Sequence, residues 1–234
     1  MHTETDKRFG NIQFNSNARL KNLSVRIKPD GIIVNMPSHL TKEKALKFVN
    51  DNAEKIISKQ KLISDKKESN SLIINSDTKL KTLSFETNVI FAERKNLHFL
   101  LKNGILNIEV PHNFVFENGQ KDIWNGINYF LKKEAKRLLP SRLAQLAQHY
   151  NFKFASVKIQ SAKTRWGSCS GAKDINLSMY LMLLPSHLID YVLLHELCHT
   201  IEMNHSEHFW ALMNKVTNNK SKQLRAELKK YSMP

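Results

Sequence analysis

The alternation of apolar and polar residues in the first third of the chain predicts strands followed by a helix. After about nine mobile residues a strand starts near Ile12, and residues 20–28 alternate between apolar and polar side chains. Residues 28–31 read Lys-Pro-Asp-Gly, which favours a turn, and residues 32–36 return as the next strand. From residue 41 to about residue 63 apolar side chains recur at helical spacing. The expected unit is a β-hairpin followed by a helix.

Short apolar runs in the middle of the chain predict a region of antiparallel strands. The expected strands are 72–74, 83–91, 97–101 and 105–110. Lys102-Asn103-Gly104 is typical of a tight turn between antiparallel neighbours, so the last two of these runs should form a hairpin.

The second half of the chain favours helices around a few strands. Apolar positions from Asp122 to Ala147 recur at helical spacing, and Pro140 either kinks this helix or begins its second half. The other expected elements are strands at 154–163 and 175–178, a helix that follows Pro185 and Ser186, and helices at 207–216 and 221–231. The fold class is therefore α+β, with a hairpin, helix and antiparallel strand region in residues 1–120 and a second domain in residues 121–234.

The strongest chemical signal is the sequence His195-Glu196-Leu197-Cys198-His199. On a helix, residues four apart lie on the same face one turn apart, so His195 and His199 can bind one small cation together. Glu196 is rotated by about 100° from His195, which is too far to ligate the same ion but suitable for reaching a water on it. This H-E-x-x-H arrangement indicates a zinc site whose glutamate is the general base.

His205 is the expected third metal ligand. It follows His199 by six residues, and a continuous helix would carry it roughly 9 Å further along the axis, so the helix must end between them. Asn204 is expected to end this helix in a left-handed conformation, and Ser206 is expected to cap the next one. The less favoured alternative is a glutamate ligand from a later helix, with Glu227 best placed.

Composition indicates a globular protein of a reducing compartment. The chain has 234 residues, of which 41% are hydrophobic, and this is enough for a real core. Cys169 and Cys198 form no disulfide framework, and no apolar stretch approaches the length that spans a bilayer. We therefore expect a cytoplasmic location without a membrane partner. Cys198 is interpreted as a small buried residue beside a ligand and not as a ligand itself.

The formal net charge of +15 raises the hypothesis of a nucleic-acid partner, because Lys and Arg side chains that neutralise phosphates supply most non-specific affinity. The basic residues are spread along the chain, and no run of them is interleaved with aromatic residues. A solvated, lysine-rich surface is therefore at least as well supported as a nucleic-acid groove.

Several segments taken together are more specific than the zinc motif alone. They are Arg165-Trp166-Gly167-Ser168-Cys169, Leu184-Pro185, the H-E-x-x-H motif, Asn204-His205-Ser206-x-x-Phe209-Trp210 and the hairpin sequence of residues 23–31. In these segments the chain resembles the YgjP-like metallopeptidases, which are related to the SprT and WLM groups. The resemblance implies a zincin-like catalytic core with His195, His199 and His205 as zinc ligands and Glu196 as the catalytic residue. Metzincin-type peptidases have glycine where this chain has Glu202, so the turn before His205 is expected at Asn204.

The favoured function is that of a zinc-dependent peptidase, which would cleave a protein or peptide substrate through a zinc-bound water activated by Glu196. The same water could instead attack the phosphoanhydride bond of a nucleoside triphosphate, which a basic surface would suit. A DNA-associated metalloprotease, by analogy with the SprT and WLM relatives, is a further alternative. A purely structural zinc is disfavoured, because structural sites normally fill all four positions with protein ligands.

The remaining features of the site stay open in the sequence. Candidates for a second electrophile are Arg165, Tyr180, His208 and Tyr231. By analogy with zincin folds, residues 161–167 could supply an edge strand for an extended substrate. Iron, cobalt and nickel are also compatible with a site of three histidines.

Overall fold

The computed structural model describes residues 2–70 and 73–234, and the side chains within residues 4–63 and 73–234. Backbone packing divides the chain into two compact units, Met1–Ser71 and Leu72–Pro234. This boundary differs from the predicted division after residue 120. The strands between residues 86 and 111 pack into the same hydrophobic core as the helix that follows them, which is why they group with the second unit.

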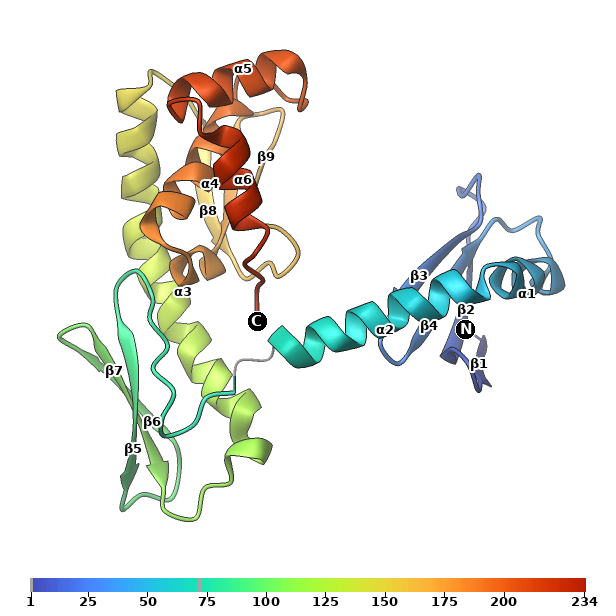
Figure 1. Ribbon diagram of the computed structural model, residues 1–234, viewed down its shortest axis with the longest axis horizontal. Coiled ribbons are helices and arrows are strands. Elements are labelled where there is room, and N and C mark those ends of the chain that lie inside the picture. The colour runs from blue at the N-terminus through green and yellow to red at the C-terminus, as the bar shows by residue number, and fades with distance from the viewer. Residues whose placement is uncertain (1, 71–72) are drawn as a thin grey trace. The chain divides into compact units, whose positions relative to one another are not determined.

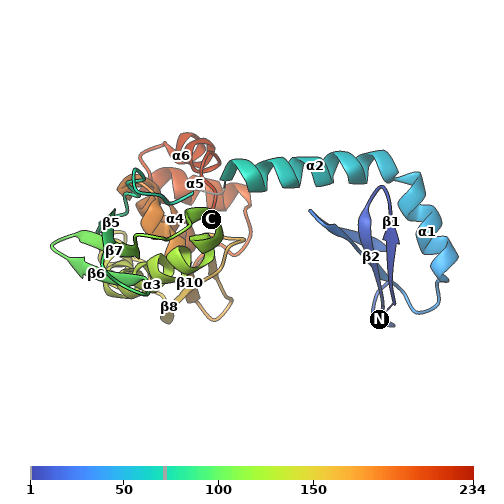
Figure 2. The same cartoon turned by 90° about the horizontal axis from the view of Figure 1, so that it is seen from below.

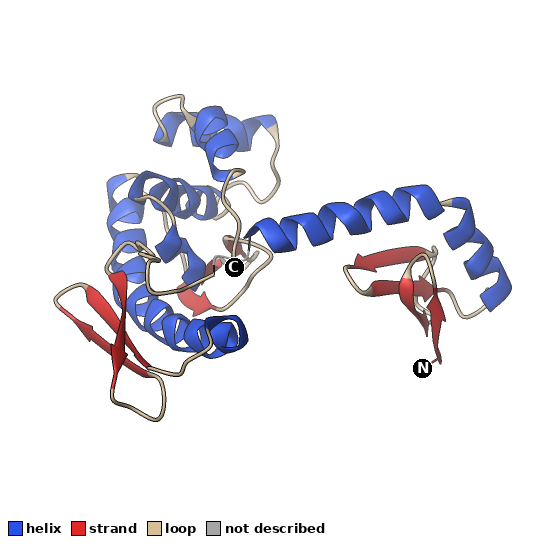
Figure 3. Cartoon of the chain, turned by 60° about the horizontal axis from the view of Figure 1, so that its bottom comes forward, coloured by secondary structure: helices blue, strands red, loops and turns tan. Residues whose placement is uncertain are grey.

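In the first unit a four-stranded sheet carries helices on one face. The strands are β1 (His2–Asp6), β2 (Gly10–Ser16), β3 (Ser24–Lys28) and β4 (Gly31–Met36), in the order β1-β2-β4-β3. β3 and β4 form the expected hairpin. The apolar side of the sheet packs against α1 (Lys42–Asp51) and α2 (Ala53–Asn70), as Figures 2 and 3 show.

Two expectations for this unit are corrected. Residues 2–6, which were expected to be mobile, form β1 because they pair antiparallel with β2. The single helix expected from 41 to 63 is interrupted at Asn52, which lies between α1 and α2. The Asn52 side chain donates to the carbonyl of Phe48 at 2.9 Å, and such local bonds compete with the regular helix.

The second unit begins with a small mixed sheet. Its strands are β5 (Glu86–Ala92), β6 (His98–Lys102) and β7 (Ile105–Pro111), in the order β5-β7-β6. Asn103 and Gly104 have φ values of 51° and 75°, as the predicted tight turn between β6 and β7 requires. β5 runs parallel to β7, so the expectation of a purely antiparallel region is wrong.

Residues 73–74 form no strand, although the sequence predicted one at 72–74; residue 72 lies outside the described residues. The backbone of Ile74 bonds to a side chain instead of to a neighbouring strand. Its N–H donates to Gln120 Oε1 at 2.9 Å, and its carbonyl accepts from Gln120 Nε2 at 2.8 Å. One glutamine amide thus takes the place of a strand partner.

The long helix α3 (Phe116–His149) runs through the second unit, as Figure 1 shows. It starts before the expected Asp122 and continues through Pro140. The apolar residues of one side are fully buried on both sides of this proline: Ile123, Ile127, Leu131, Leu139 and Leu143. Their burial offsets the hydrogen bond that proline cannot make. Among the helices that the structure describes, none is both long enough and apolar enough to cross a bilayer.

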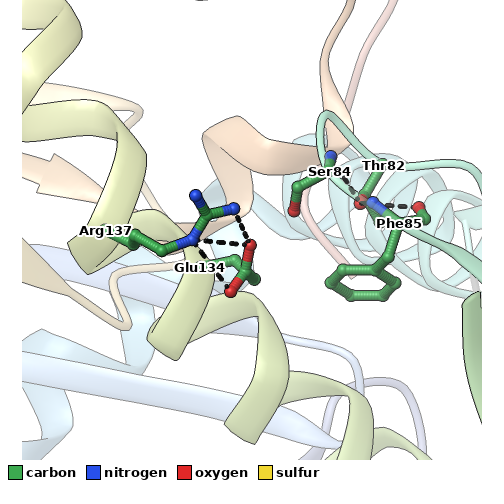
Figure 4. A network of polar contacts seen from close by, with 5 residues as sticks. All are labelled: Thr82, Ser84, Phe85, Glu134 and Arg137. Atoms are coloured by element: carbon green, nitrogen blue, oxygen red, sulfur yellow. Dashed lines mark hydrogen bonds and ion pairs between the residues drawn. The ribbon is translucent and has the colours of Figure 1, made fainter. Parts of the chain in front are cut away.

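An ion pair between the buried Glu134 and the exposed Arg137 lies on α3, and Figure 4 shows it together with the turn that leads into β5. Glu134 accepts from Arg137 Nη2 at 2.5 Å, and this bond holds the pKa of the Glu134 carboxyl below its ordinary value. In the turn, the Thr82 hydroxyl accepts from the N–H of Phe85 at 3.0 Å and donates to the carbonyl of the same residue at 2.7 Å. Side-chain bonds therefore fix the entry of the chain into this sheet.

A third small sheet precedes the remaining helices. Its strands are β8 (Ser156–Gln160), β9 (Gly167–Cys169) and β10 (Asp174–Ser178), in the order β8-β10-β9. After them come the 3-10 helix η1 (Met179–Leu183), α4 (Ser186–Cys198), α5 (Glu207–Val216) and α6 (Ser221–Leu228). β8, β10 and the helices after Pro185 lie close to where the sequence predicted them.

The three sheets repeat one topology. In the strand sets β2–β4, β5–β7 and β8–β10, the third strand lies between the first two, parallel to the first and antiparallel to the second, and a helix follows. β1 is an additional strand at the edge of the first sheet. Each sheet also carries one amide pair that bridges its parallel strands. The pairs are Asn15–Asn35 at 3.4 Å, Asn88–Asn107 at 3.0 Å and Gln160–Asn176 at 2.7 Å. This repeat is not visible in the sequence, because the side chains that face each core differ from sheet to sheet.

Replacement of Ile127 tests the core that α3 shares with the strands and with α4. The side chain is fully buried, so Ile127→Ala should lower the free energy of unfolding by about 2–5 kcal/mol. Tyr129 on the same helix is 65% exposed, and Tyr129→Ala should change it by only about 0.5 kcal/mol. Urea denaturation monitored by circular dichroism measures both values, and equal effects would contradict the assignment of the buried side of α3.

Candidate metal centre

Most of the surface of helix α4 is buried, and this burial holds the H-E-x-x-H motif rigidly. Leu188, Val192 and Leu193 pack into the core of the second unit, and Leu197 and Cys198 are fully buried. Burial raises the pKa of the Cys198 thiol to about 12. Cys198 is therefore a neutral packing residue at neutral pH, as the sequence suggested.

The chain leaves α4 at His199 and reverses within a few residues. His199 is the C-cap of α4, and the N–H of Glu202 donates to the carbonyl of Cys198 at 2.9 Å. Asn204 does not have a positive φ, so the prediction of a left-handed turn at this residue is wrong. Ser206 accepts from the N–H of Phe209 and caps α5, as predicted.

The three predicted histidines meet at one point. His195 Nε2 lies 3.2 Å from His199 Nε2 and 3.1 Å from His205 Nε2. One ligand atom from each histidine falls within a group whose members all lie within 4.8 Å of one another. Nitrogen ligands of a tetrahedral zinc lie about 3.3 Å apart, since each lies about 2.0–2.1 Å from the ion. The two short spacings match this geometry.

Neighbouring groups fix the orientation of these rings. His199 Nδ1 lies 2.9 Å from the carbonyl of Glu202, and an N–H donated to that oxygen leaves Nε2 free as a ligand atom. The buried ring of Phe209 stacks on His199 with centroids 4.5 Å apart. Trp210 stacks on His205 at 5.9 Å. The first turn of α5 thus forms an aromatic floor under the histidines.

Burial lowers the pKa of two of the three histidines, His195 and His205. Burial, aided by the neighbouring histidines and by Arg225, lowers the pKa of His195 to about 3. Burial also lowers the pKa of His205, with help from His199 and Arg225. Because a metal ligand must be a neutral imidazole, both shifts favour ligation at neutral pH.

Glu196 is a buried carboxylate without a partner. It is 4% exposed, and within the described part of the chain its Oε2 atom has no hydrogen-bond partner. Burial raises its pKa to about 8, and Arg165 opposes this shift only in part. A buried, unpaired carboxyl of this kind is typical of functional sites.

Gly167 on β9 makes room for that carboxylate. A Cβ atom at this position would lie 2.6 Å from Glu196 Oε1 and 2.7 Å from Glu196 Cγ. Both distances are too short for any side chain, so only glycine lets β9 lie directly against Glu196. This contact explains why glycine stands at the centre of the Arg-Trp-Gly-Ser-Cys segment.

The residues fit a metal ion by two independent observations. Three histidine nitrogens converge near ligand spacing, and within the described residues the carboxyl one residue after His195 is buried with one oxygen unpaired. Three protein ligands leave a tetrahedral position open, which distinguishes catalytic from structural sites.

A cleft of about 380 Å³ lies in front of the motif and takes residues from several elements. His195 and Glu196 line it together with Arg165 and Tyr231, which were among the predicted second electrophiles. Tyr191 and Arg225 also line it, although sequence reasoning missed them. Tyr191 lies one helical turn before His195, and this spacing could have drawn attention to it. Arg225 gave no such signal, because the segment from His205 to α6 brings it to the cleft only in three dimensions.

Three candidate residues lie away from the cleft. Tyr180 is 1% exposed and belongs to the hydrophobic core. His208 is exposed and does not line the cleft. Glu227 bonds to His187 Nε2 at 2.8 Å and lies outside the histidine cluster, so the alternative of a glutamate third ligand is wrong.

The segment expected to offer an edge strand lies beside the cleft. β9 is an edge strand of its sheet, and it begins at Gly167, where the predicted segment 161–167 ends. Arg165, Trp166 and Gly167 line the cleft.

Comparison with known families bears directly on this site. A family model described as the YgjP-like metallopeptidase domain matches residues 21–231, which include most of the first unit and the whole histidine cluster. The chain belongs to the YgjP-like metallopeptidase family. As a YgjP-like metallopeptidase it is a metal-dependent hydrolytic enzyme that acts on protein or peptide substrates.

Two further comparisons were made for this YgjP-like metallopeptidase. The crystal structure of the metallopeptidase zymogen of Pyrococcus abyssi abylysin is similar over 40% of this chain and 94% of that chain, with 22% sequence identity and a TM-score of 0.36. A comparison with curated proteins gave no match.

The raised pKa of Glu196 predicts how pH affects the stability of protein treated with a chelator. The folded carboxyl titrates at about 8 and the ordinary value is 4.5, so between these pH values the folded state binds more protons than the unfolded state. The contribution of Glu196 to stability should therefore fall as pH rises through this window, by up to about 1.4 kcal/mol per pH unit. Because the lowered pKa of His195 adds stability over part of the same range in both proteins, the expected result is that the wild type loses stability relative to Glu196→Gln as pH rises. Urea denaturation of both proteins at pH 5, 6.5 and 8 measures the difference. Titration of His195 affects both proteins alike, so parallel stability curves would contradict the burial of the Glu196 carboxyl.

Proposed function

We propose that this protein is a zinc peptidase in which His195, His199 and His205 hold the ion and Glu196 is the general base. The observation that carries the proposal is the convergence of three Nε2 atoms beside Glu196, a buried carboxylate that lines the cleft together with His195. Zinc is favoured because neutral imidazoles at tetrahedral spacing suit it, and because a fourth open position is typical of catalytic zinc.

The chemistry divides between the ion and the protein. A bound zinc supplies Lewis acidity, which polarises the scissile carbonyl and makes a water more acidic. Glu196 accepts a proton from the attacking water at a carboxylate oxygen and then donates it to the leaving amine. Burial raises the pKa of the Glu196 carboxyl above its ordinary value, so this carboxyl retains a proton more readily than an exposed one and can pass it on to the leaving amine.

The walls of the cleft position the substrate. Arg165 lies near enough to Glu196 to affect its titration, and it lines the cleft from the segment before β9. Its guanidinium can donate hydrogen bonds to an oxygen that gains negative charge during the reaction. The edge of β9 offers backbone groups to an extended peptide, which would lie across the mouth of the cleft as an added strand.

Replacement of Glu196 by glutamine tests the proposed base. Glu196→Gln should keep one zinc per chain and lower kcat/KM on denatured protein by about 10²- to 10⁴-fold, because general base catalysis contributes about that much. Glu202→Gln is the control, because it removes a nearby carboxylate while the backbone carbonyl of residue 202, which contacts His199, is unchanged. This variant should retain both zinc and activity. Metal analysis by mass spectrometry and a fluorescent casein assay give the two readouts. Full cleavage by Glu196→Gln would exclude this base, and Glu196-dependent hydrolysis of nucleoside triphosphates without peptide cleavage would favour phosphoanhydride chemistry.

Addition of one methyl group to Gly167 tests the position of the base without changing it chemically. Gly167→Ala places a Cβ against Glu196, so zinc should stay bound while kcat falls by about 10²-fold, as expected for a displacement of about 1 Å. Gly171→Ala is the matched control, because a Cβ there meets no atom within 4 Å. Steady-state kinetics with metal analysis measure both variants, and equal kcat values would contradict the close contact between β9 and Glu196.

A further inference from the structure

The charged residues that line the cleft are mostly cationic. Arg165, Arg225 and Lys229 line it, and Glu196 is its one acidic lining residue among those described. The rest of the lining is apolar or aromatic and includes Val192 and Leu228. A ligand that enters this cleft therefore meets positive charge on otherwise apolar walls, where charge interactions are stronger than in open solvent.

Arg225 is held close to the histidines. Its guanidinium lies 5.0 Å from the ring centroid of Trp210, and Trp210 stacks on His205 at 5.9 Å. One aromatic ring thus separates the guanidinium from a candidate metal ligand. A guanidinium held against an aromatic ring can still donate its N–H groups to a planar acceptor.

Lys229 extends the same positive surface. It is the C-cap residue of α6 and lies four residues after Arg225. Side chains four residues apart lie on the same face of a helix. In the part of the chain that the structure describes, no ion pair involves Arg225, Lys229 or Arg165. The acidic residue of α6, Glu227, bonds to His187 instead. The cations of the cleft therefore have their charge available for a ligand.

We propose that Arg225 and Lys229 form a subsite that binds a carboxylate of the peptide substrate, so that the enzyme selects acidic positions next to the scissile bond. This proposal rests on the proposed peptidase function and deepens it. A peptide offers carboxylates from Asp and Glu side chains or from its C-terminus, and the guanidinium fork of Arg225 matches either by two parallel hydrogen bonds.

The test compares peptides that differ by one charge. The starting peptide has the sequence around a bond that the enzyme cleaves in a denatured protein. In a set of variants of this peptide, each residue around the scissile bond is replaced in turn by Glu or by Gln. Each peptide is made with a free and with an amidated C-terminus. The wild type should prefer Glu over Gln at one position by about tenfold or more in kcat/KM, because hydrogen bonds to charged groups contribute that much. A preference confined to free C-termini would assign the subsite to the terminal carboxylate, and one that persists in amidated peptides would assign it to a side chain.

Matched variants locate the effect. Arg225→Met and Lys229→Met should each reduce the preference toward one, and Arg225→Lys should restore part of it. Lys230→Met changes the same charge at the next residue, which does not line the cleft, and should leave the preference as in the wild type. If Lys230→Met reduced the preference for Glu as much as Arg225→Met does, the effect would be one of net charge and the proposal would be overturned. The proposal would also be overturned if both Arg225→Met and Lys229→Met kept the wild-type preference.

Binding separates this proposal from the peptidase function. Fluorescence anisotropy of labelled Glu and Gln peptides with the Glu196→Gln protein measures recognition without cleavage. Preferred binding of the Glu peptide that depends on Arg225 supports the subsite even if the wild type cleaves no peptide, in which case only the proposed reaction fails. Equal binding of the two peptides, or displacement of both only by a nucleoside triphosphate, overturns the carboxylate subsite. Melting temperatures of all variants confirm that they fold.

Discussion

The site depends on the burial of the Glu196 carboxyl and of the His199 imidazole, with His195 partly buried beside them and His205 at the exposed edge. Glu196 and His199 lie under the surface, and His195 is largely covered by its own helix and by α5. A buried carboxyl without a partner is costly, and so are imidazoles that cannot take up protons. A cation bound among these groups would compensate both costs. The tight packing that creates the site would thus also favour a positive ion within it.

The second unit is built to sustain that dry environment. α3 supplies a continuous apolar surface, against which α4 and the third sheet pack. β9 closes the other side, and the absence of a side chain at Gly167 lets it approach Glu196 to within contact distance. The aromatic residues at the start of α5 complete the enclosure. The histidines are therefore fixed by elements that are distant in sequence, although the ligands themselves lie within eleven residues.

Local periodicity was enough to predict much of this arrangement. The spacing of His195 and His199 fixes their common face on any helix, and Ser206 caps α5 as its side-chain chemistry requires. Non-local pairing was beyond it: β5 joins β7 in parallel, and residues 2–6 become a strand only because β2 offers a free edge. The same limit explains why Arg225 was not predicted to line the cleft. It also explains why a left-handed turn was predicted at Asn204, whereas the chain turns earlier, where the N–H of Glu202 donates to the carbonyl of Cys198. The roles of the histidines and of Glu196 in metal binding and catalysis stay predictions.

The repeated three-stranded topology has a consequence for how the chain folds. Each sheet draws its strands from one short stretch, 10–36, 86–111 or 156–178, apart from β1, which joins the edge of the first sheet from the residues just before it. No strand pairs with a strand of another sheet in the described residues. Sheet formation then requires only the closure of short loops, and low contact order of this kind permits rapid folding. During synthesis each sheet can form before the next one leaves the ribosome, so the histidines, which follow the last sheet, are brought together on a scaffold that already exists.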